Sequence, residues 1–102
     1  MGLILFSWDE AKNAANQRKH GVSFDAAKLV FDDPLHVTRQ DRIEHGEQRW
    51  QTLGMAGGVV LLLFAHTWQD SDTPTGSHAE HIRIISARRA TKPERKVYEQ
   101  GA

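Results

Sequence analysis

Four arginines give this sequence the chemistry of an anion-binding site. Arg83, Arg88 and Arg89 lie on and just after one predicted strand, and Arg49 lies on another strand of the same predicted sheet. A planar guanidinium can donate two parallel hydrogen bonds to phosphate oxygens, so four that converge would form a phosphodiester site. The alternative is ordinary ion pairing with Asp or Glu.

The segment Lys19-His20-Gly21 is a second candidate. It puts a cationic and a titratable side chain at the end of a predicted helix, where the helix dipole favours positive charge. Imidazole is the side chain that ordinarily changes charge near neutral pH, so His20 is a candidate for proton transfer, with Lys19 beside it. The alternative is a helix end stabilised by its dipole, with no chemical role.

His66, His78 and His81 could in principle assemble a metal site, because two of them are three residues apart and His66 precedes a polar loop. No carboxylate or cysteine stands at a diagnostic spacing, and the sequence has no Walker or dinucleotide-binding signature. We therefore expect exposed loop histidines, no bound metal and no cofactor.

Three tryptophans could stack on nucleic-acid bases, as aromatic side chains do in proteins that bind single strands. In so small a domain, however, a tryptophan more often belongs to the core. We expect Trp8 and Trp50 to pack inside, and both interpretations stay open for Trp68, which adjoins a polar segment.

Length and composition limit the fold and the class of protein. The chain has 102 residues, 39% of them hydrophobic, which predicts one compact domain over residues 1–102. It has no cysteine, which excludes disulfides and a cysteine nucleophile and fits a reducing cytosol. Its apolar run at 59–65 is about a third of a membrane span. We expect a soluble, cytoplasmic protein.

The net charge of zero argues against a domain that binds polyanions by bulk attraction. The charge is nevertheless uneven. From His81 onward the chain has two acidic residues, Glu94 and Glu99, and six basic ones: Arg83, Arg88, Arg89, Lys92, Arg95 and Lys96. This pattern indicates a local anionic ligand, or surface charge that fell unevenly by chance.

Periodicity and capping signals predict the elements that position these residues. The first half predicts a strand at 3–6, a helix at 8–19 capped by Ser7 with Glu10 and ended by Gly21, and a second helix from Ser23 to Asp33. The second half predicts strands near 35–37 and at 49–54, 59–65 and 82–88, with turns at His45-Gly46 and Gly57-Gly58 and a loop at 69–78. The run at 59–65 is typical of a strand covered on both faces. A capping box from Thr91 to Glu94 starts a last helix that reaches Tyr98.

These elements predict an α+β domain in the order β-α-α-β-β-β-β-α. Successive strands joined by short turns give an antiparallel sheet of about four to five strands, with the helices packed on one face. Arg83 alternates with Ile82 and Ile84, so if those isoleucines face the helices, Arg83 points to the open face of the sheet.

Several blocks of the sequence together resemble the BrnT toxin family. The opening block runs from Phe6 to Phe24 and contains Trp8-Asp9-Glu10 and Lys19-His20-Gly21. The other blocks are 30–34, 46–49 ahead of Leu53-Gly54, 82–90, 94–95 and 98–99. They occur in the family's order and cover nearly the whole chain, although the segment 69–80 is longer than the family pattern.

The resemblance implies a RelE-like fold and a ribonuclease toxin of a type II toxin–antitoxin system, which cleaves RNA without the ribosome and thereby inhibits translation and growth. It implies neutralisation by a BrnA-type antitoxin, operator DNA bound only through that antitoxin, and a toxin pair within a heterotetramer. Because no metal-ligand set is visible, we expect cleavage without a metal.

A metal-free ribonuclease needs a base for the 2′-OH proton, an acid for the leaving 5′-oxygen, and cations for the charge that builds up at phosphorus. The predicted catalytic residues are His20 as the titrating group and Lys19, Arg49, Arg83 and Arg88 as phosphate-binding cations. Arg89, Tyr98 and Trp68 are predicted substrate contacts, and the assignment of base and acid stays open. The alternatives are a non-catalytic nucleic-acid-binding module and a protein-interaction domain that use the same arginines.

Overall fold

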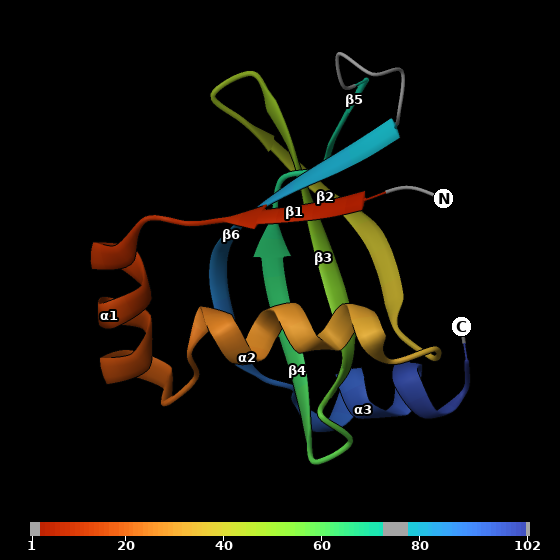
Figure 1. Ribbon diagram of the computed structural model, residues 1–102. Coiled ribbons are helices and arrows are strands. Elements are labelled where there is room, and N and C mark those ends of the chain that lie inside the picture. The colour runs from red at the N-terminus through yellow and green to blue at the C-terminus, as the bar shows by residue number, and fades with distance from the viewer. Residues whose placement is uncertain (1–2, 73–77, 102) are drawn as a thin grey trace.

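The computed structural model describes residues 3–72 and 78–101 and shows a twisted sheet with helices around it (Figure 1). In chain order the elements are β1 (Leu3–Ser7), α1 (Glu10–His20), α2 (Phe24–Lys28), the 3₁₀ turn η1 (Leu29–Asp32), β2 (Val37–Glu44), β3 (Glu47–Ala56), β4 (Val60–His66), β5 (Gln69–Asp72), β6 (His78–Arg89) and α3 (Lys92–Glu99). The α+β class and the expected succession of elements are confirmed, with β5 as an additional strand. None of the helices in the described ranges is long and apolar enough to cross a membrane.

The sheet has the strand order β1-β6-β4-β3-β2, and β5 also pairs with β6. The pairs β2–β3, β3–β4 and β4–β6 are antiparallel, as expected. The pair β1–β6 is parallel. The prediction of an antiparallel sheet is therefore wrong for one pair. It was inferred from hairpin connections, and β1 is not joined to β6 by a hairpin because the rest of the sheet and two helices lie between them in sequence.

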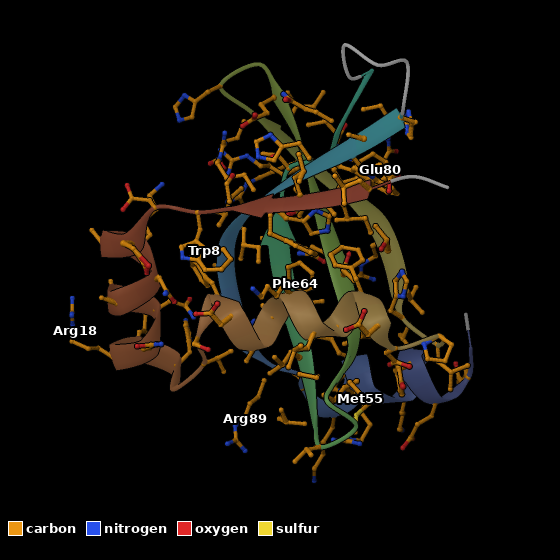
Figure 2. The ribbon with its side chains drawn as sticks, viewed as in Figure 1. Trp8, Arg18, Met55, Phe64, Glu80 and Arg89 are labelled. Atoms are coloured by element: carbon orange, nitrogen blue, oxygen red, sulfur yellow. The ribbon has the colours of Figure 1, made fainter. Side chains whose placement is uncertain are left out.

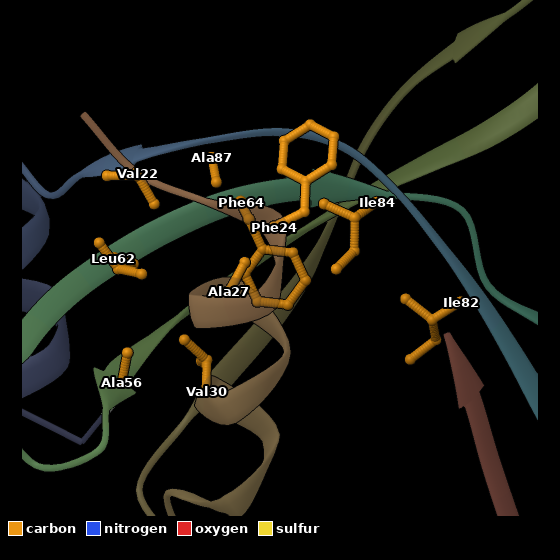
Figure 3. Close-up of a cluster of buried hydrophobic side chains, with 10 residues drawn as sticks. All are labelled: Val22, Phe24, Ala27, Val30, Ala56, Leu62, Phe64, Ile82, Ile84 and Ala87. Atoms are coloured by element: carbon orange, nitrogen blue, oxygen red, sulfur yellow. The ribbon is translucent and has the colours of Figure 1, made fainter. Parts of the chain in front are cut away.

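The face of the sheet under α2 carries the main core, which Figure 3 shows in close-up. Phe24 and Ala27 of α2 and Val30 of η1 are completely buried against Phe64 and other strand residues. The further members of this core are Val22, Ala56, Leu62, Ile82, Ile84 and Ala87. Burying one of its larger apolar side chains, such as Phe64, contributes about 1.5–3 kcal/mol. Because this cluster has more buried members than the one on the other face, it supplies most of the apolar stabilisation.

The opposite face of the sheet carries a smaller apolar cluster covered by α3. Leu53 of β3 and Leu61 and Leu63 of β4 pack there against Val97 and Tyr98 of the helix. The prediction that all helices lie on one face is therefore wrong. The apolar run of β4 explains the arrangement, because its alternate residues face opposite sides and both sides are covered, as the run at 59–65 predicted.

The helix ends follow local chemistry, with one correction. Asp9, and not Ser7, caps α1, and its carboxylate accepts hydrogen bonds from the N–H groups of Ala11 and Lys12. Ser7 belongs to β1, where its Oγ lies 2.9 Å from His81 Nε2. The caps predicted at Ser23 and Thr91 are confirmed, the latter as a complete capping box with Glu94. The helix predicted at 8–19 thus begins two residues later, at Glu10, because Ser7, the predicted cap, is the last residue of β1.

An asparagine joins α1 to the sheet where β1 has ended. Asn16 is buried, and its Nδ2 donates hydrogen bonds of 2.8 Å to the carbonyl oxygens of Val22 and Ala87. Its Oδ1 accepts a hydrogen bond of 3.2 Å from the N–H of Ala87. On the side of β6 that faces away from β4, β1 pairs only as far as Arg83, so one asparagine side chain satisfies both backbone groups of Ala87 there.

Gly54 lets the α2–η1 segment approach β3 closely. A Cβ atom at this position would lie 2.6 Å from Val30 Cγ1 and 3.0 Å from His36 Cβ, so a side chain would force the two layers apart.

The predicted loop at 69–78 differs from the structure, since Gln69–Asp72 forms β5. Its polar sequence gives no strand pattern, and residues 73–77 lie outside the described residues.

Candidate functional site

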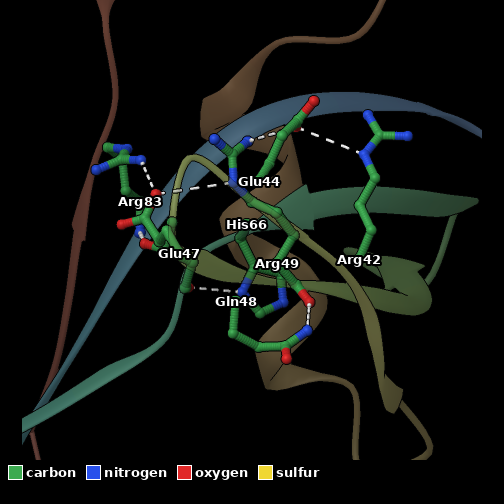
Figure 4. Close-up of polar contacts among 8 residues, drawn as sticks. Arg42, Glu44, Glu47, Gln48, Arg49, His66 and Arg83 are labelled. Carbon is green, nitrogen blue, oxygen red and sulfur yellow. Dashed lines mark hydrogen bonds and ion pairs between the residues drawn. The ribbon is translucent and has the colours of Figure 1, made fainter.

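A chain of ion pairs lies on the sheet face opposite α2, at the end near the β2–β3 turn (Figure 4). Arg83 Nη2 donates a hydrogen bond of 2.7 Å to Glu47 Oε1. Arg49 lies between two carboxylates, with Nε 3.7 Å from Glu47 Oε1 and Nη1 3.7 Å from Glu44 Oε2. Arg42 Nε lies 3.5 Å from the same Glu44 oxygen. We call these five residues the arginine–glutamate chain.

Strand alternation brings the two central arginines to this face. Ile82 and Ile84 are buried in the core under α2, so Arg83 between them points the other way, and its side chain is 46% exposed. The predicted orientation of Arg83 is confirmed. On β3, Arg49 lies an even number of residues from Leu53, which faces α3, so both are on the same side of the sheet.

Arg49 is the least satisfied member of the chain. Its side chain is only 15% exposed, and its Nε is buried without a hydrogen-bond partner. A buried donor without a partner costs about 1–3 kcal/mol, and the carboxylates at 3.7 Å are too distant to relieve that cost. Arg49 is therefore a charged residue of this face whose hydrogen bonding is incomplete in the described structure.

Arg88 is on the same face but belongs to a different group. Its guanidinium donates hydrogen bonds of 2.8 and 2.9 Å to the two carboxylate oxygens of Glu94, which also caps α3. The hydrogen bonds from Arg88 lower the pKa of Glu94 to about 2, and the same pairing raises the pKa of Arg88. This geometry fits the ion-pairing alternative for Arg88, with a role in anchoring α3.

Tyr98 is committed to Asp33, away from the arginine–glutamate chain. Its hydroxyl donates a hydrogen bond of 2.6 Å to Asp33 Oδ2, which also accepts one from the N–H of Met55. The contact with the Asp33 carboxylate raises the pKa of Tyr98 to about 12. Partial burial acts to raise the pKa of Asp33, but the hydrogen bonds that it accepts hold that pKa below its ordinary value. Tyr98 therefore keeps its proton at neutral pH.

Lys19, His20 and Arg89 lie toward the side of the molecule that carries α1 and α2. Lys19 and His20 are exposed at the end of α1, and Arg89 lines a shallow pocket with Gln17 and Gly21. In Figure 2, Arg89 points outward, whereas Trp8 and Phe64 point inward between α2 and the sheet. Within the described ranges, no hydrogen bond or ion pair connects these three residues to the arginine–glutamate chain.

Trp68 lies beside the chain. It lines a pocket with Glu47, Gln48 and Thr67, and 37% of its surface is exposed. Its ring meets Trp50 edge to face, with 5.2 Å between the ring centroids, and its Nε1 donates to Glu80 Oε1 at 3.3 Å. Trp8 packs edge to face on Phe24, as expected of a core residue. Trp68 thus keeps part of a ring surface available to a ligand next to Glu47.

The three histidines considered for a metal are not together. His66 is completely buried, which lowers its pKa to about 4, so the prediction of an exposed histidine is wrong for it. Its Nδ1 lies 2.8 Å from the carbonyl oxygen of Thr67 and must donate, so Nε2 accepts the hydroxyl of Thr52 at 2.7 Å. His78 is instead grouped with Asp70 and Glu80, whose ligand atoms all lie within 4.8 Å of one another at the exposed β5–β6 pair. This group is where a divalent cation could bind.

Comparison with known proteins identifies the family. Residues 8–94 match the family described as "Ribonuclease toxin, BrnT, of type II toxin-antitoxin system". The chain belongs to the BrnT family. Its fold resembles the crystal structure of the Brucella abortus ribonuclease toxin BrnT at a TM-score of 0.55 and 22% identity, covering 88% of this chain and 99% of that one. No match was found among curated proteins.

Membership of the BrnT family implies an RNA substrate and an antitoxin partner. The arginine–glutamate chain lies within the matched range, and Arg49 and Arg83 are the predicted residues that the fold brings together. Glu47 was not predicted, although a signal for it existed. It precedes Arg49 by two residues on a strand, which places the carboxylate and the guanidinium on one face.

Proposed function

We propose that this BrnT-family chain is an endoribonuclease toxin that cleaves RNA without a metal ion and without the ribosome, and so inhibits translation and growth. The observation that carries the proposal is the pair Arg83 and Arg49 around Glu47, on the sheet face opposite the main core and beyond the apolar cluster under α3. Guanidinium groups bind phosphate oxygens and stabilise the negative charge of the transition state.

The roles of the predicted residues divide by their position. Arg49 and Arg83 bind the scissile phosphate, and Trp68 provides a surface for a base. Arg88 and Tyr98 stabilise the fold and do not contact the RNA, because they already donate hydrogen bonds to Glu94 and Asp33. We assign Lys19, His20 and Arg89 to contacts with a more distant part of the RNA or with the antitoxin, because no hydrogen bond or ion pair in the described ranges connects them to the arginine–glutamate chain.

The proposed partners follow from the family and from the charge of the chain. A BrnA-type antitoxin neutralises the toxin, and a toxin pair forms within a heterotetramer in the cytoplasm. The zero net charge makes this chain a poor DNA-binding protein by itself, so operator DNA is bound only through the antitoxin.

Cleavage of single-stranded RNA in excess EDTA tests the proposal. The purified chain should cut a labelled RNA and leave a 2′,3′-cyclic phosphate or 3′-phosphate, because the 2′-hydroxyl is the nucleophile. A matched RNA with a 2′-O-methyl group at the cleavage position should resist. Activity that appears only with added divalent metal would contradict the metal-free mechanism and direct attention to Asp70, His78 and Glu80.

A non-catalytic nucleic-acid-binding module is the second candidate, favoured by the carboxylates that already pair with Arg49 and Arg83. Such a module would shift RNA in a gel and leave it intact. Expression of the chain alone separates the two in cells, since a ribonuclease toxin should arrest growth and coexpression of its antitoxin should relieve the arrest.

A further inference from the structure

We infer that Glu47 is the general base of the proposed ribonuclease, and that its Oε2 takes the proton from the ribose 2′-hydroxyl. The inference rests on the proposed function and extends it by assigning a role that the sequence left open. Three observations carry it: how Glu47 is held, which of its oxygens is occupied, and what lies beside it.

The first observation is that the backbone and the carboxylate of Glu47 are both fixed. Glu47 begins β3 opposite Glu44, across a tight turn in which His45 and Gly46 have φ values of 53° and 74°. Its carboxylate is bound to Arg83 on β6, a different strand, at 2.7 Å. A catalytic group held from two elements keeps its geometry during the reaction, which is how positioned groups accelerate a step.

The second observation is that the two carboxylate oxygens differ. In the described part of the chain, every hydrogen bond and ion pair of the Glu47 side chain uses Oε1, which is shared by Arg83 and Arg49. Oε2 makes no such contact there, and 28% of the side chain is exposed. One oxygen therefore anchors the group while the other is available to accept a proton (Figure 4).

The third observation is that Glu47 shares a pocket with an aromatic side chain. Glu47 and Trp68 line the same pocket, together with Gly46, Gln48 and Thr67. Stacking on an aromatic ring is the usual way to hold a base of single-stranded RNA. A base stacked on Trp68 would lie in the pocket that Glu47 lines, and Glu47 in turn contacts both arginines.

Other titratable groups are less suited to this proton transfer. His66 is buried with both ring nitrogens hydrogen-bonded, and Tyr98 donates its proton to Asp33. His20 lies at the end of α1 without a contact to the arginines in the described structure. Glu44 faces the same arginine but contacts neither Arg83 nor the Trp68 pocket.

The proposed reaction is an attack of the ribose 2′-oxygen on the adjacent phosphorus. As the O2′–H proton passes to Glu47, O2′ forms a bond to phosphorus and the P–O5′ bond breaks. The departing O5′ takes a proton from water, and the protonated Glu47 later returns its proton to water. Arg83 and Arg49 face the phosphate oxygens on which negative charge accumulates, and the products are a 2′,3′-cyclic phosphate and a 5′-hydroxyl.

Glu47→Gln is the test, with Glu99→Gln on exposed α3 as its matched control. Each is assayed on a labelled RNA and on the same RNA with sulfur in place of the scissile O5′, because a thiolate leaves without protonation. We expect Glu47→Gln to lose about 10²–10⁴-fold in kcat on both RNAs, while RNA affinity and melting temperature stay near wild type. Glu47→Asp, which keeps a carboxylate, should recover part of the rate, and Glu99→Gln should match the wild type.

Each other outcome overturns a distinct statement. Recovery of Glu47→Gln on the sulfur-containing RNA would mean that Glu47 acts on the leaving group, and so would overturn its role as the base. Full activity of Glu47→Gln beside an active wild type would remove Glu47 from the chemistry and leave the proposed function standing. A wild type that binds RNA and cuts neither substrate would overturn the proposed function and this inference together.

Discussion

The two faces of the sheet differ in how completely their buried polar groups are hydrogen-bonded. Under α2, Phe24 and Phe64 are completely buried, and the completely buried His66 has both ring nitrogens hydrogen-bonded. On the other face, near the β2–β3 turn, Arg49 is mostly buried, and its Nε has no hydrogen-bond partner among the residues that the structure describes. Natural interiors rarely leave such a donor unsatisfied, so the two faces differ in how completely their polar groups are paired.

The α3 end of the second face supports this distinction. There Arg88 and Glu94 satisfy each other through two hydrogen bonds, beside the apolar cluster of Leu61 and Leu63. Charge on the same face is thus fully paired where it anchors a helix and incompletely paired where we propose that RNA binds. Four substitutions can test whether stability and activity divide between the faces in this way.

The largest expected effect is on stability, from Phe64→Ala on the face under α2. Removing a completely buried phenyl ring should lower the free energy of unfolding by about 3–5 kcal/mol, as for other large-to-small core changes. Denaturant unfolding measures the loss, and the cleavage rate per folded molecule should stay near wild type. A loss of activity in the folded fraction would mean that the two faces are coupled.

Acid should destabilise the protein through His66. Its folded-state pKa of about 4 lies below the ordinary value of 6.5, so the unfolded chain binds a proton at a pH where the folded chain does not. The stabilisation is complete above about pH 6.5 and is lost as the pH falls toward 4, on the order of 3 kcal/mol in total. Thermal melts across this range, compared with His66→Gln, should show the variant losing less stability on acidification. Parallel pH curves for the two would contradict it.

Arg83→Ala should affect activity and spare stability. Losing a guanidinium that stabilises transition-state charge should lower the cleavage rate by about 10²-fold or more, whereas a half-exposed ion pair contributes only about 0–1 kcal/mol to folding. The same preparation should be assayed for RNA cleavage and for its melting temperature, with Arg18→Ala on α1 as the control. Near-wild-type turnover in Arg83→Ala would remove the candidate site from this face.

His20→Ala is expected to have the smallest effect. The sequence nominated His20 as the titrating catalytic residue, but its position at the exposed end of α1 predicts a cleavage rate within a few-fold of wild type. Single-turnover cleavage of a short RNA measures this directly. A loss of about 10²-fold in a normally folded variant would restore the role predicted from the sequence and would place the chemistry on the α1 side.

The parts of the fold that depend on neighbouring residues were predictable. The caps at Ser23 and Thr91, the turns at His45-Gly46 and Gly57-Gly58, and the outward side of Arg83 are all signals within a few residues. The features that were missed are pairings between distant segments. Asn16 meets Ala87, and Arg83 meets Glu47, across 71 and 36 residues, and neither asparagine nor glutamate has a local pattern that names its partner.

The placement of α3 shows a different limit. The apolar run at 59–65 correctly indicated a strand covered on both faces, which required a helix on each side of the sheet. We nevertheless expected all helices on one face of a sheet built from hairpins. The apolar residues Val97 and Tyr98 of α3 were too few to decide which side they would meet. The polar β5 was missed because its sequence, Gln69–Asp72, has none of the residues that favour strands.

The late position of β6 has a consequence for synthesis of the protein. This strand pairs with β1, β4 and β5 and carries Arg83, so β1 cannot pair in the sheet until residues 79–83 have left the ribosome. Folding must close a loop from Leu3 to Ala79, a non-local contact of the kind that makes folding slow. A nascent or prematurely terminated chain therefore has neither a complete sheet nor the Arg83–Glu47 pair. The activity that we propose therefore cannot appear before β6 has been translated.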